Sequence, residues 1–247
     1  MSVTARAWLA RAAHRLAGTI TGAETGDPLA ALTFDDGPDP RWTPRVLDVL
    51  RGHGARATFF MVGAAAARHP ELVARVAAEG HAIGNHSWDH AAFSRLDARA
   101  RRRQLRACQR ALAPWGRRLF RPPFGEQTLA TRLDALWLRH AVVGWTVDSG
   151  DWWDADAARI AETLERRVRP GDIVLFHDAL FEAEDGPGDG RRRPVLSRAP
   201  HRDREAMLAA LERFLTAAAG RLRFVTVPEL LARGRARREP WSRRGAA

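Results

Sequence analysis

The segment Thr33-Phe34-Asp35-Asp36-Gly37-Pro38 places two neighbouring carboxylates directly after an apolar run, Leu29-Ala30-Ala31-Leu32. The run is typical of a buried strand, and the Gly-Pro pair turns the chain away at its end. Two adjacent negative charges cost free energy unless a cation, a shared proton or a metal ion compensates them. Asp, Gly and Pro are also common turn residues, so the segment alone fits an ordinary turn equally well. The rest of the chain decides between the two interpretations.

The composition fits one large globular domain. The chain has 247 residues, of which 45% are hydrophobic and 28% are charged, which is enough for a sizeable core. Its net charge is +11, and all its basic residues are Arg because the chain contains no Lys. Such a charge favours nucleic acid, an anionic membrane surface or an acidic polymer as partner. The arginines are spread along the chain without a known nucleic-acid-binding pattern, so we do not expect a nucleic-acid partner.

The N-terminal residues 1–24 are expected to form a leader rather than a signal peptide. Arg6, Arg11 and Arg15 interrupt its short apolar stretch, which favours a short amphipathic helix that covers one end of the domain or rests on a membrane. The sequence has no apolar stretch long enough to span a bilayer, and the single Cys108 excludes an intrachain disulfide. The default expectation is therefore a cytoplasmic protein, with export or peripheral membrane contact left open.

Between residues 25 and 232, short apolar runs alternate with helical patterns and are bounded by Gly and Pro. The alternation predicts an α/β fold with a parallel sheet and outer helices, and about seven such units would close as a single barrel. Strands are expected at 29–32, 57–62, 81–84, 119–120, 141–147, 173–176 and 223–227, and helices at 44–52, 70–79, 97–113, 128–139, 155–168, 204–218 and 228–231.

Two further segments lack this alternation. The segment 183–200 is rich in Gly, Pro and charge, and is expected to be a mobile surface loop. The tail 233–247 is basic and poor in apolar residues, and is expected to be frayed.

Each unusual polar cluster follows a predicted strand. The clusters are Asp35-Asp36, 86–90, Arg121, 148–151 and His177-Asp178. The C-terminal ends of barrel strands are where active sites lie. Five such placements by chance would be improbable, so the sequence predicts one active site at this edge of the sheet.

His86 and His90 are four residues apart, so both imidazoles can face one point. Neutral imidazole suits Zn, Ni, Co or Fe. One carboxylate from the Asp35-Asp36 pair would complete a ligand set that leaves positions open for water and substrate. The alternative is two surface histidines at the start of a helix, and the nearby carboxylate pair favours the metal site.

Five segments, in this order, resemble the motifs of polysaccharide deacetylases, the NodB-homology enzymes of carbohydrate esterase family 4. They are 33–38 (TFDDGP), 86–90 (HSWDH), 121–125 (RPPFG), 148–152 (DSGDW) and 175–177 (LFH). The resemblance covers about Leu29 to Leu231 and implies a catalytic domain at 25–232 that folds as a distorted (β/α) barrel. It also implies one divalent metal ion, Zn²⁺ first, with Co²⁺, Ni²⁺ or Mn²⁺ as alternatives.

The resemblance also implies roles for individual residues. The metal ligands would be Asp36, His86 and His90. The catalytic groups would be Asp35 as general base, His177 as general acid, Arg121, which would orient and tune Asp35, and Asp151, in preference to Asp148, as the partner of His177. Trp152, Phe124 and Pro123 would contact the substrate. The third motif usually ends in Tyr where this chain has Phe124, so a role for that residue would use its backbone N–H.

The function implied is removal of N-acetyl groups from amino-sugar polymers or glycoconjugates, with an acetylated carbohydrate as substrate. Metal-activated water, a base and an acid are the groups that amide hydrolysis requires. An O-acetyl esterase and a small-molecule amidase are alternatives on the same site. A non-catalytic carbohydrate-binding relative is a third, and the presence of every expected catalytic residue type argues against it.

Overall fold

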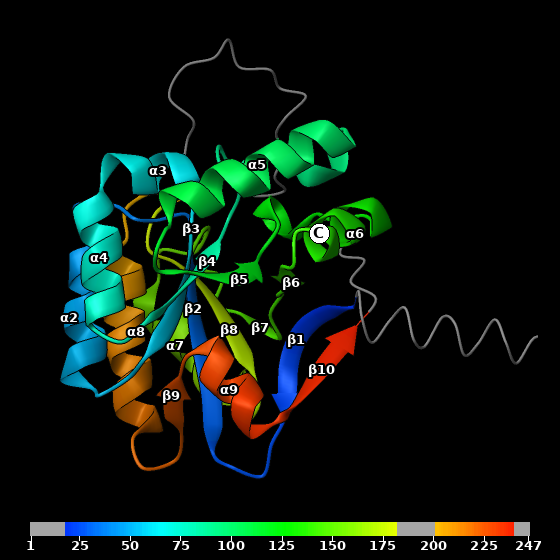
Figure 1. The fold of residues 1–247 in the computed structure, drawn as a ribbon. Helices are drawn as coiled ribbons and strands as arrows, with labels where there is room; N and C mark the ends of the chain where they lie inside the picture. The colour runs from blue at the N-terminus through cyan, green and yellow to red at the C-terminus, as the bar shows by residue number, and fades with distance from the viewer. Residues whose placement is uncertain (1–17, 182–200, 240–247) are drawn as a thin grey trace, which may run out of the picture.

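The computed structural model describes residues 18–181 and 201–239, which form a curled parallel sheet flanked by helices (Figure 1). The leader helix expected within residues 1–17, the loop expected at 183–200 and residues 240–247 lie outside the described residues. The sheet has the order β6-β5-β4-β3-β2-β8-β7, and β9 pairs with β2. Its strands are β2 (Leu29–Asp35), β3 (Ala57–Met61), β4 (Ala82–Asn85), β5 (Gly116–Phe120), β6 (Ala141–Val142), β7 (Val147–Asp148), β8 (Ile173–His177) and β9 (Arg223–Val225).

All pairings within this sheet are parallel, which confirms the α/β prediction. The strands β6 and β7 form its two edges, so the barrel is open. Residues of α2, α4, α5, α7 and α8 pack on one face of the sheet, and α6 packs on this face beside α5, whereas α9 packs on the opposite face; Figure 1 shows α2, α4 and α8 near one end of the curled sheet and α6 near the other. The helices are α2 (Thr43–Gly52), α3 (Gly63–Arg68), α4 (Pro70–Ala78), α5 (Ala98–Ala111), α6 (Leu129–Trp137), α7 (Ala157–Arg167), α8 (Glu205–Ala218) and α9 (Val227–Arg233).

Local sequence signals set several helix starts. Asp97 caps α5 by accepting a hydrogen bond from the Ala100 N–H, and Asp156 caps α7 in the same way. Thr128 and Thr226 open α6 and α9 with reciprocal capping boxes. Such caps satisfy backbone donors that the first helical turn leaves unpaired. The four capped helices start within two residues of the positions predicted for them.

The strand β2 is buried along its whole length, as expected for a central strand covered on both faces. Phe34 stacks between Phe59 of β3, at 5.1 Å between ring centroids, and Phe176 of β8, at 5.5 Å. These three residues are aligned across neighbouring strands. The next row of the sheet therefore sets Asp35 directly beside His177.

The single strand predicted at 141–147 is wrong, because β6 and β7 are two short strands separated by residues 143–146. The carbonyls of Val143 and Gly144 accept hydrogen bonds from the buried guanidinium of Arg121. The Gly144 N–H donates to the carbonyl of Ile20 instead of to a neighbouring strand of the sheet. The apolar run is therefore buried as expected, but two of its backbone carbonyls accept hydrogen bonds from Arg121.

The chain ends expected to be a leader helix and a frayed tail contain strands. β1 (Thr19–Glu24) and β10 (Arg235–Glu239) pair with each other in antiparallel fashion. Backbone hydrogen bonds do not require apolar side chains, and Arg235 forms a 2.7 Å ion pair with Glu24 across the two strands. The sequence misses β10 because its arginines obscure the strand pattern.

Candidate metal centre and active site

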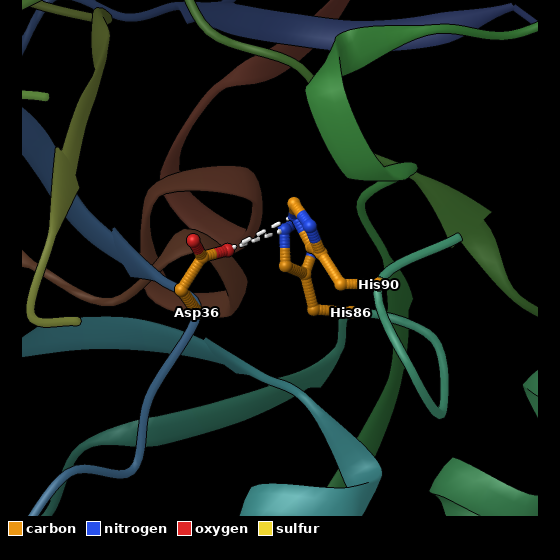
Figure 2. Close-up of side chains that lie close together, drawn as sticks. All are labelled: Asp36, His86 and His90. Atoms are coloured by element: carbon orange, nitrogen blue, oxygen red, sulfur yellow. Dashed lines mark ion pairs between the residues drawn. The ribbon is translucent and has the colours of Figure 1, made fainter. Parts of the chain in front are cut away.

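Asp36, His86 and His90 form a buried cluster at the ends of β2 and β4. The Asp36 Oδ1 lies 3.2 Å from Nε2 of His86 and 3.1 Å from Nε2 of His90. Figure 2 shows both imidazoles directed at this carboxylate. The three potential ligand atoms lie within 4.8 Å of one another. The structure thus brings together the three residues that the sequence predicts as metal ligands.

The chemistry of these three donors fits a divalent ion. The Nδ1 of His86 lies 2.8 Å from the carbonyl of Arg121; because a carbonyl only accepts, Nδ1 carries the hydrogen and Nε2 is left as the donor to a metal. Burial alone would raise the pKa of Asp36, but His90 and His86 hold this pKa well below its usual range. Its Oδ1 is buried without a hydrogen-bond partner among the described residues. One anionic oxygen and imidazole nitrogens suit Zn²⁺ or a similar ion.

The backbone around this cluster is held in an uncommon conformation. Asp36, Ser87, His90 and Phe124 have φ values of 77°, 70°, 58° and 59°. Left-handed conformations at such residues cost about 1–3 kcal/mol each and persist only where the surroundings enforce them. Four of the five non-glycine residues with positive φ in the described part of the chain lie here, so the uncommon backbone conformations concentrate around this cluster.

Asp35 forms a buried ion pair with Arg121. The Nη1 of Arg121 donates to Oδ1 of Asp35 at 2.7 Å and to Oγ1 of Thr33 at 2.8 Å, and Nη2 donates to the Gly144 carbonyl at 2.8 Å. The guanidinium is fully buried, so these contacts fix its orientation. The other carboxylate oxygen of Asp35 lies 3.8 Å from Nε2 of His86. Asp35 therefore lies between the cation of Arg121 and the Asp36–His86–His90 cluster.

His177 and Asp151 form a second ion pair. The His177 Nδ1 lies 3.1 Å from Oδ1 of Asp151, and the His177 backbone N–H donates to Oδ2 of the same carboxylate at 3.1 Å. Burial alone would lower the pKa of His177, but the charge and hydrogen bond of Asp151 outweigh it and raise this pKa to about 9. An imidazole with such a pKa is protonated at neutral pH, so His177 can donate a proton.

Arg204 extends this pair and is not indicated by the sequence. Its Nη1 donates to Oδ2 and to the backbone carbonyl of Asp151, both at 3.1 Å. The side chain is fully buried at the start of α8. Arg204 is 53 residues from Asp151 along the chain, and no local pattern distinguishes it from the many surface arginines. Only the packing of α8 brings it to the site.

Asp178 supports the turn that follows Asp36. Burial raises the pKa of Asp178 to about 7, opposed by the hydrogen bond from Thr43, whose Oγ1 donates to Oδ2 at 2.5 Å. A Cβ at Gly37 would lie 2.4 Å from this carboxylate. Gly37 is therefore needed for close approach.

The three residues expected at the substrate lie in different surroundings. The Phe124 ring packs against His90, with 4.5 Å between ring centroids. Pro123 is buried in the short 3₁₀ turn Pro123–Gly125. Trp152 follows Asp151 in the turn after β7, and its carbonyl accepts a hydrogen bond from the His201 N–H. Of these three described residues, only Phe124 has a ring contact with the Asp36–His86–His90 cluster.

The family model for polysaccharide deacetylases matches residues 22–166. The chain belongs to the polysaccharide deacetylase family. This confirms the resemblance to the NodB-homology enzymes of carbohydrate esterase family 4 and the prediction of a carbohydrate deacetylase of the hydrolase class.

Relatives of this polysaccharide deacetylase match over most of its length. A chitooligosaccharide deacetylase of Sinorhizobium fredii is 40% identical over 167 residues, which cover 65% of this chain and 76% of the relative. A peptidoglycan-N-acetylglucosamine deacetylase of Bacillus cereus is 35% identical over 210 residues, which cover 83% and 89%. A crystal structure of a peptidoglycan N-acetylglucosamine deacetylase matches with a TM-score of 0.76 and 28% identity, over 94% of this chain and 99% of that one.

Among the residues that the structure describes, no helix combines the length and the apolar character needed to cross a bilayer.

Proposed function

We propose that this polysaccharide deacetylase removes N-acetyl groups from amino-sugar polymers or glycoconjugates of the chitooligosaccharide or peptidoglycan type. The observation that carries the proposal is the row of the sheet in which Asp35 and His177 lie side by side, next to the Asp36–His86–His90 cluster. A base, an acid and a metal-ligand set at one edge are what hydrolysis of an amide requires. The named relatives support an N-acetylated amino sugar as the substrate class.

Asp36, His86 and His90 would hold the divalent ion, with Zn²⁺ as the first candidate. Once bound, it supplies Lewis acidity to the acetyl carbonyl and to a water molecule. Asp36 contributes the single negative charge of this ligand set, and the Arg121 carbonyl fixes the tautomer of His86.

Asp35 would act as the general base. One of its oxygens is bound by Arg121 at 2.7 Å, and the other faces His86 at 3.8 Å. The second oxygen is therefore free to accept a proton from water next to the cluster. Arg121 balances the negative charge of Asp35 and holds the carboxylate in position.

His177 would act as the general acid. Its Nδ1 faces Asp151 at 3.1 Å, which leaves Nε2 to donate a proton to the nitrogen of the leaving sugar amine. A pKa raised to about 9 keeps the imidazole protonated over the physiological range. The backbone N–H of Phe124 would donate to the developing oxyanion of the acetyl group.

Acetate release from a panel of substrates tests the proposal. The panel contains N-acetylated chitooligosaccharides, peptidoglycan fragments, acetylxylan and small acetamides, each with and without a chelator. We expect release from the amino sugars, loss with chelator and loss in Asp35→Asn. Release from acetylxylan alone would indicate an O-acetyl esterase, release from acetamides alone would indicate an amidase, and binding of sugars without release would indicate a non-catalytic relative; each overturns the proposal.

A further inference from the structure

A cavity lies away from the residues of the proposed active site. This cavity, of about 320 Å³, opens beside the C-terminal end of α6, and its lining includes Arg132, Arg139 and Arg238 together with Leu136. None of the residues assigned above to metal, base or acid lines it. Among the described lining residues there is no carboxylate. Guanidinium groups in a lining whose described residues include no carboxylate suit the cavity to an anion.

The hydrogen bonds of the lining leave donors available. The Nε of Arg132 is buried and has no partner among the described residues. Arg238 uses its Nη1 to bond the Gly18 carbonyl at 2.9 Å. His140 also lines the cavity, but its two ring nitrogens face the Leu138 carbonyl and Oε1 of Gln109. The donors to a bound anion would therefore come from the arginines. A buried guanidinium N–H without a hydrogen-bond partner costs free energy unless a ligand accepts a hydrogen bond from it.

A stripe of exposed apolar side chains runs along the same helix. Leu129, Leu133, Leu136 and Trp137 are 58%, 50%, 42% and 59% exposed. Their spacing of four, three and one residues puts them on adjoining lines of one helical face. In the described part, the only other large hydrophobic residue exposed to this degree is Trp115. The apolar surface is therefore concentrated on α6 and adjoins the arginine-lined cavity through Leu136.

The surroundings of this stripe are basic. Helix α5, which packs beside α6, contains six arginines and no acidic residue. Arg102 and Arg106 lie over the ring of Trp137, at 4.5 Å and 5.1 Å from its centroid. The single acidic residue of α6, Asp134, is buried and paired with Arg101 and Arg102. Arg101 is buried in this pair.

We propose that α6 docks onto an anionic phospholipid surface, with a headgroup phosphate in the Arg132–Arg139–Arg238 cavity. Leu133 and Trp137 would enter the interfacial layer, as Leu and Trp do in helices that lie on membranes. The arginines would contact the negatively charged headgroups. An apolar stripe contributes nothing to binding a nucleic-acid backbone. The combination of this stripe with the surrounding arginines therefore favours a lipid surface over nucleic acid.

Charge also favours an anionic lipid over residues 1–17 as the occupant of the cavity. Residues 1–17 join the described part at Gly18, which lines the cavity. They contain Arg6, Arg11 and Arg15 and no acidic residue. Their charge has the same sign as the cavity, so an anionic surface is the better occupant.

Co-sedimentation of the full chain with vesicles tests the proposal. We expect sedimentation with vesicles of phosphatidylcholine mixed with phosphatidylglycerol, and none with phosphatidylcholine alone. Arg132→Gln with Arg139→Gln should lower the partition coefficient about 30-fold, since each basic residue near an anionic surface contributes about 1 kcal/mol, or about fivefold, to binding. Leu133→Ser with Trp137→Ser should lower it as well.

The matched control is Arg213→Gln with Arg221→Gln, which removes two exposed arginines, one on α8 and one just after it, and Figure 1 shows α8 apart from α6. It should sediment like the parent chain. Equal losses in the control and the cavity variant would overturn the proposal, as would equal binding to both vesicle types or to neither. Binding of duplex DNA, but not vesicles, that depends on Arg132 and Arg139 would also overturn it. Circular dichroism checks that each variant is folded.

Discussion

Replacing Asp151 by Asn should lower the pH at which His177 loses the proton that it would donate as general acid. Asp151 is the main cause of the raised pKa of His177, which is about 9 against an ordinary value of 6.5. The difference corresponds to about 3 kcal/mol in favour of the imidazolium. Without the carboxylate, burial still lowers the pKa of His177 while the charges of Asp36 and Asp35 still raise it, so this pKa falls toward its ordinary value of 6.5. A cation at Asp36 lowers both values and leaves the direction of the change intact.

The consequence for activity depends on pH. At pH 8 the protonated fraction of His177 is about 90% with a pKa of 9 and about 3% with a pKa of 6.5. If His177 is the acid, Asp151→Asn should lose about 30-fold in kcat at pH 8 and less than about twofold at pH 6 through protonation alone. The free energy of unfolding depends on pH in the same direction. The stabilisation by the His177–Asp151 pair is complete below about pH 6.5 and is lost as pH rises through about 9.

The assay is the pH profile of acetate release, with folding followed by urea denaturation because the substitution leaves Arg204 without its carboxylate partner. The matched control is Asp154→Asn, which removes a carboxylate from the same turn that is paired with the exposed Arg159. The control should keep the parent profile. A profile of Asp151→Asn that runs parallel to the parent from pH 6 to pH 9 would refute the assignment of His177 as an acid tuned by Asp151.

Three further substitutions or treatments have definite expected outcomes. Asp35→Asn should retain the bound metal, measured by elemental analysis, and lose about a hundredfold or more in kcat; parent-like turnover would remove Asp35 as the base. Arg121→Lys should cost about 2–3 kcal/mol in urea unfolding, because an ammonium cannot serve both Asp35 and the Gly144 carbonyl; an unchanged midpoint would contradict this. Burial raises the pKa of Cys108 to about 12, so iodoacetamide should label it only after unfolding, and rapid labelling of the native protein would contradict its buried position.

Much of the site could be predicted because its parts are local to strand ends. The apolar run that ends in Asp35 and Asp36 must be buried on both faces, so the two carboxylates emerge at the edge of the sheet. His86 lies one residue past the end of β4, which reaches the same edge. Parallel strands bring such residues together without any long-range information in the sequence.

The remaining features depend on contacts between distant segments. Arg204 reaches Asp151 only because α8 packs against α7, and its identity as Arg is shared with many surface positions. The pairing of β1 with β10 joins the two ends of the described chain. Between β6 and β7, the carbonyls of Val143 and Gly144 accept hydrogen bonds from Arg121. The apolar sequence of this run does not indicate such contacts.

We propose that Asp36, His86 and His90 hold one metal ion that this deacetylase needs in order to release acetate. The most direct measurement is acetate release from an N-acetylated chitooligosaccharide while the metal-free protein is titrated with Zn²⁺. We predict that the rate rises with added ion and reaches a plateau at about one equivalent, and that His86→Ala stays at the baseline over this range. A rate that is already maximal without metal, or that rises equally in His86→Ala, would contradict the claim.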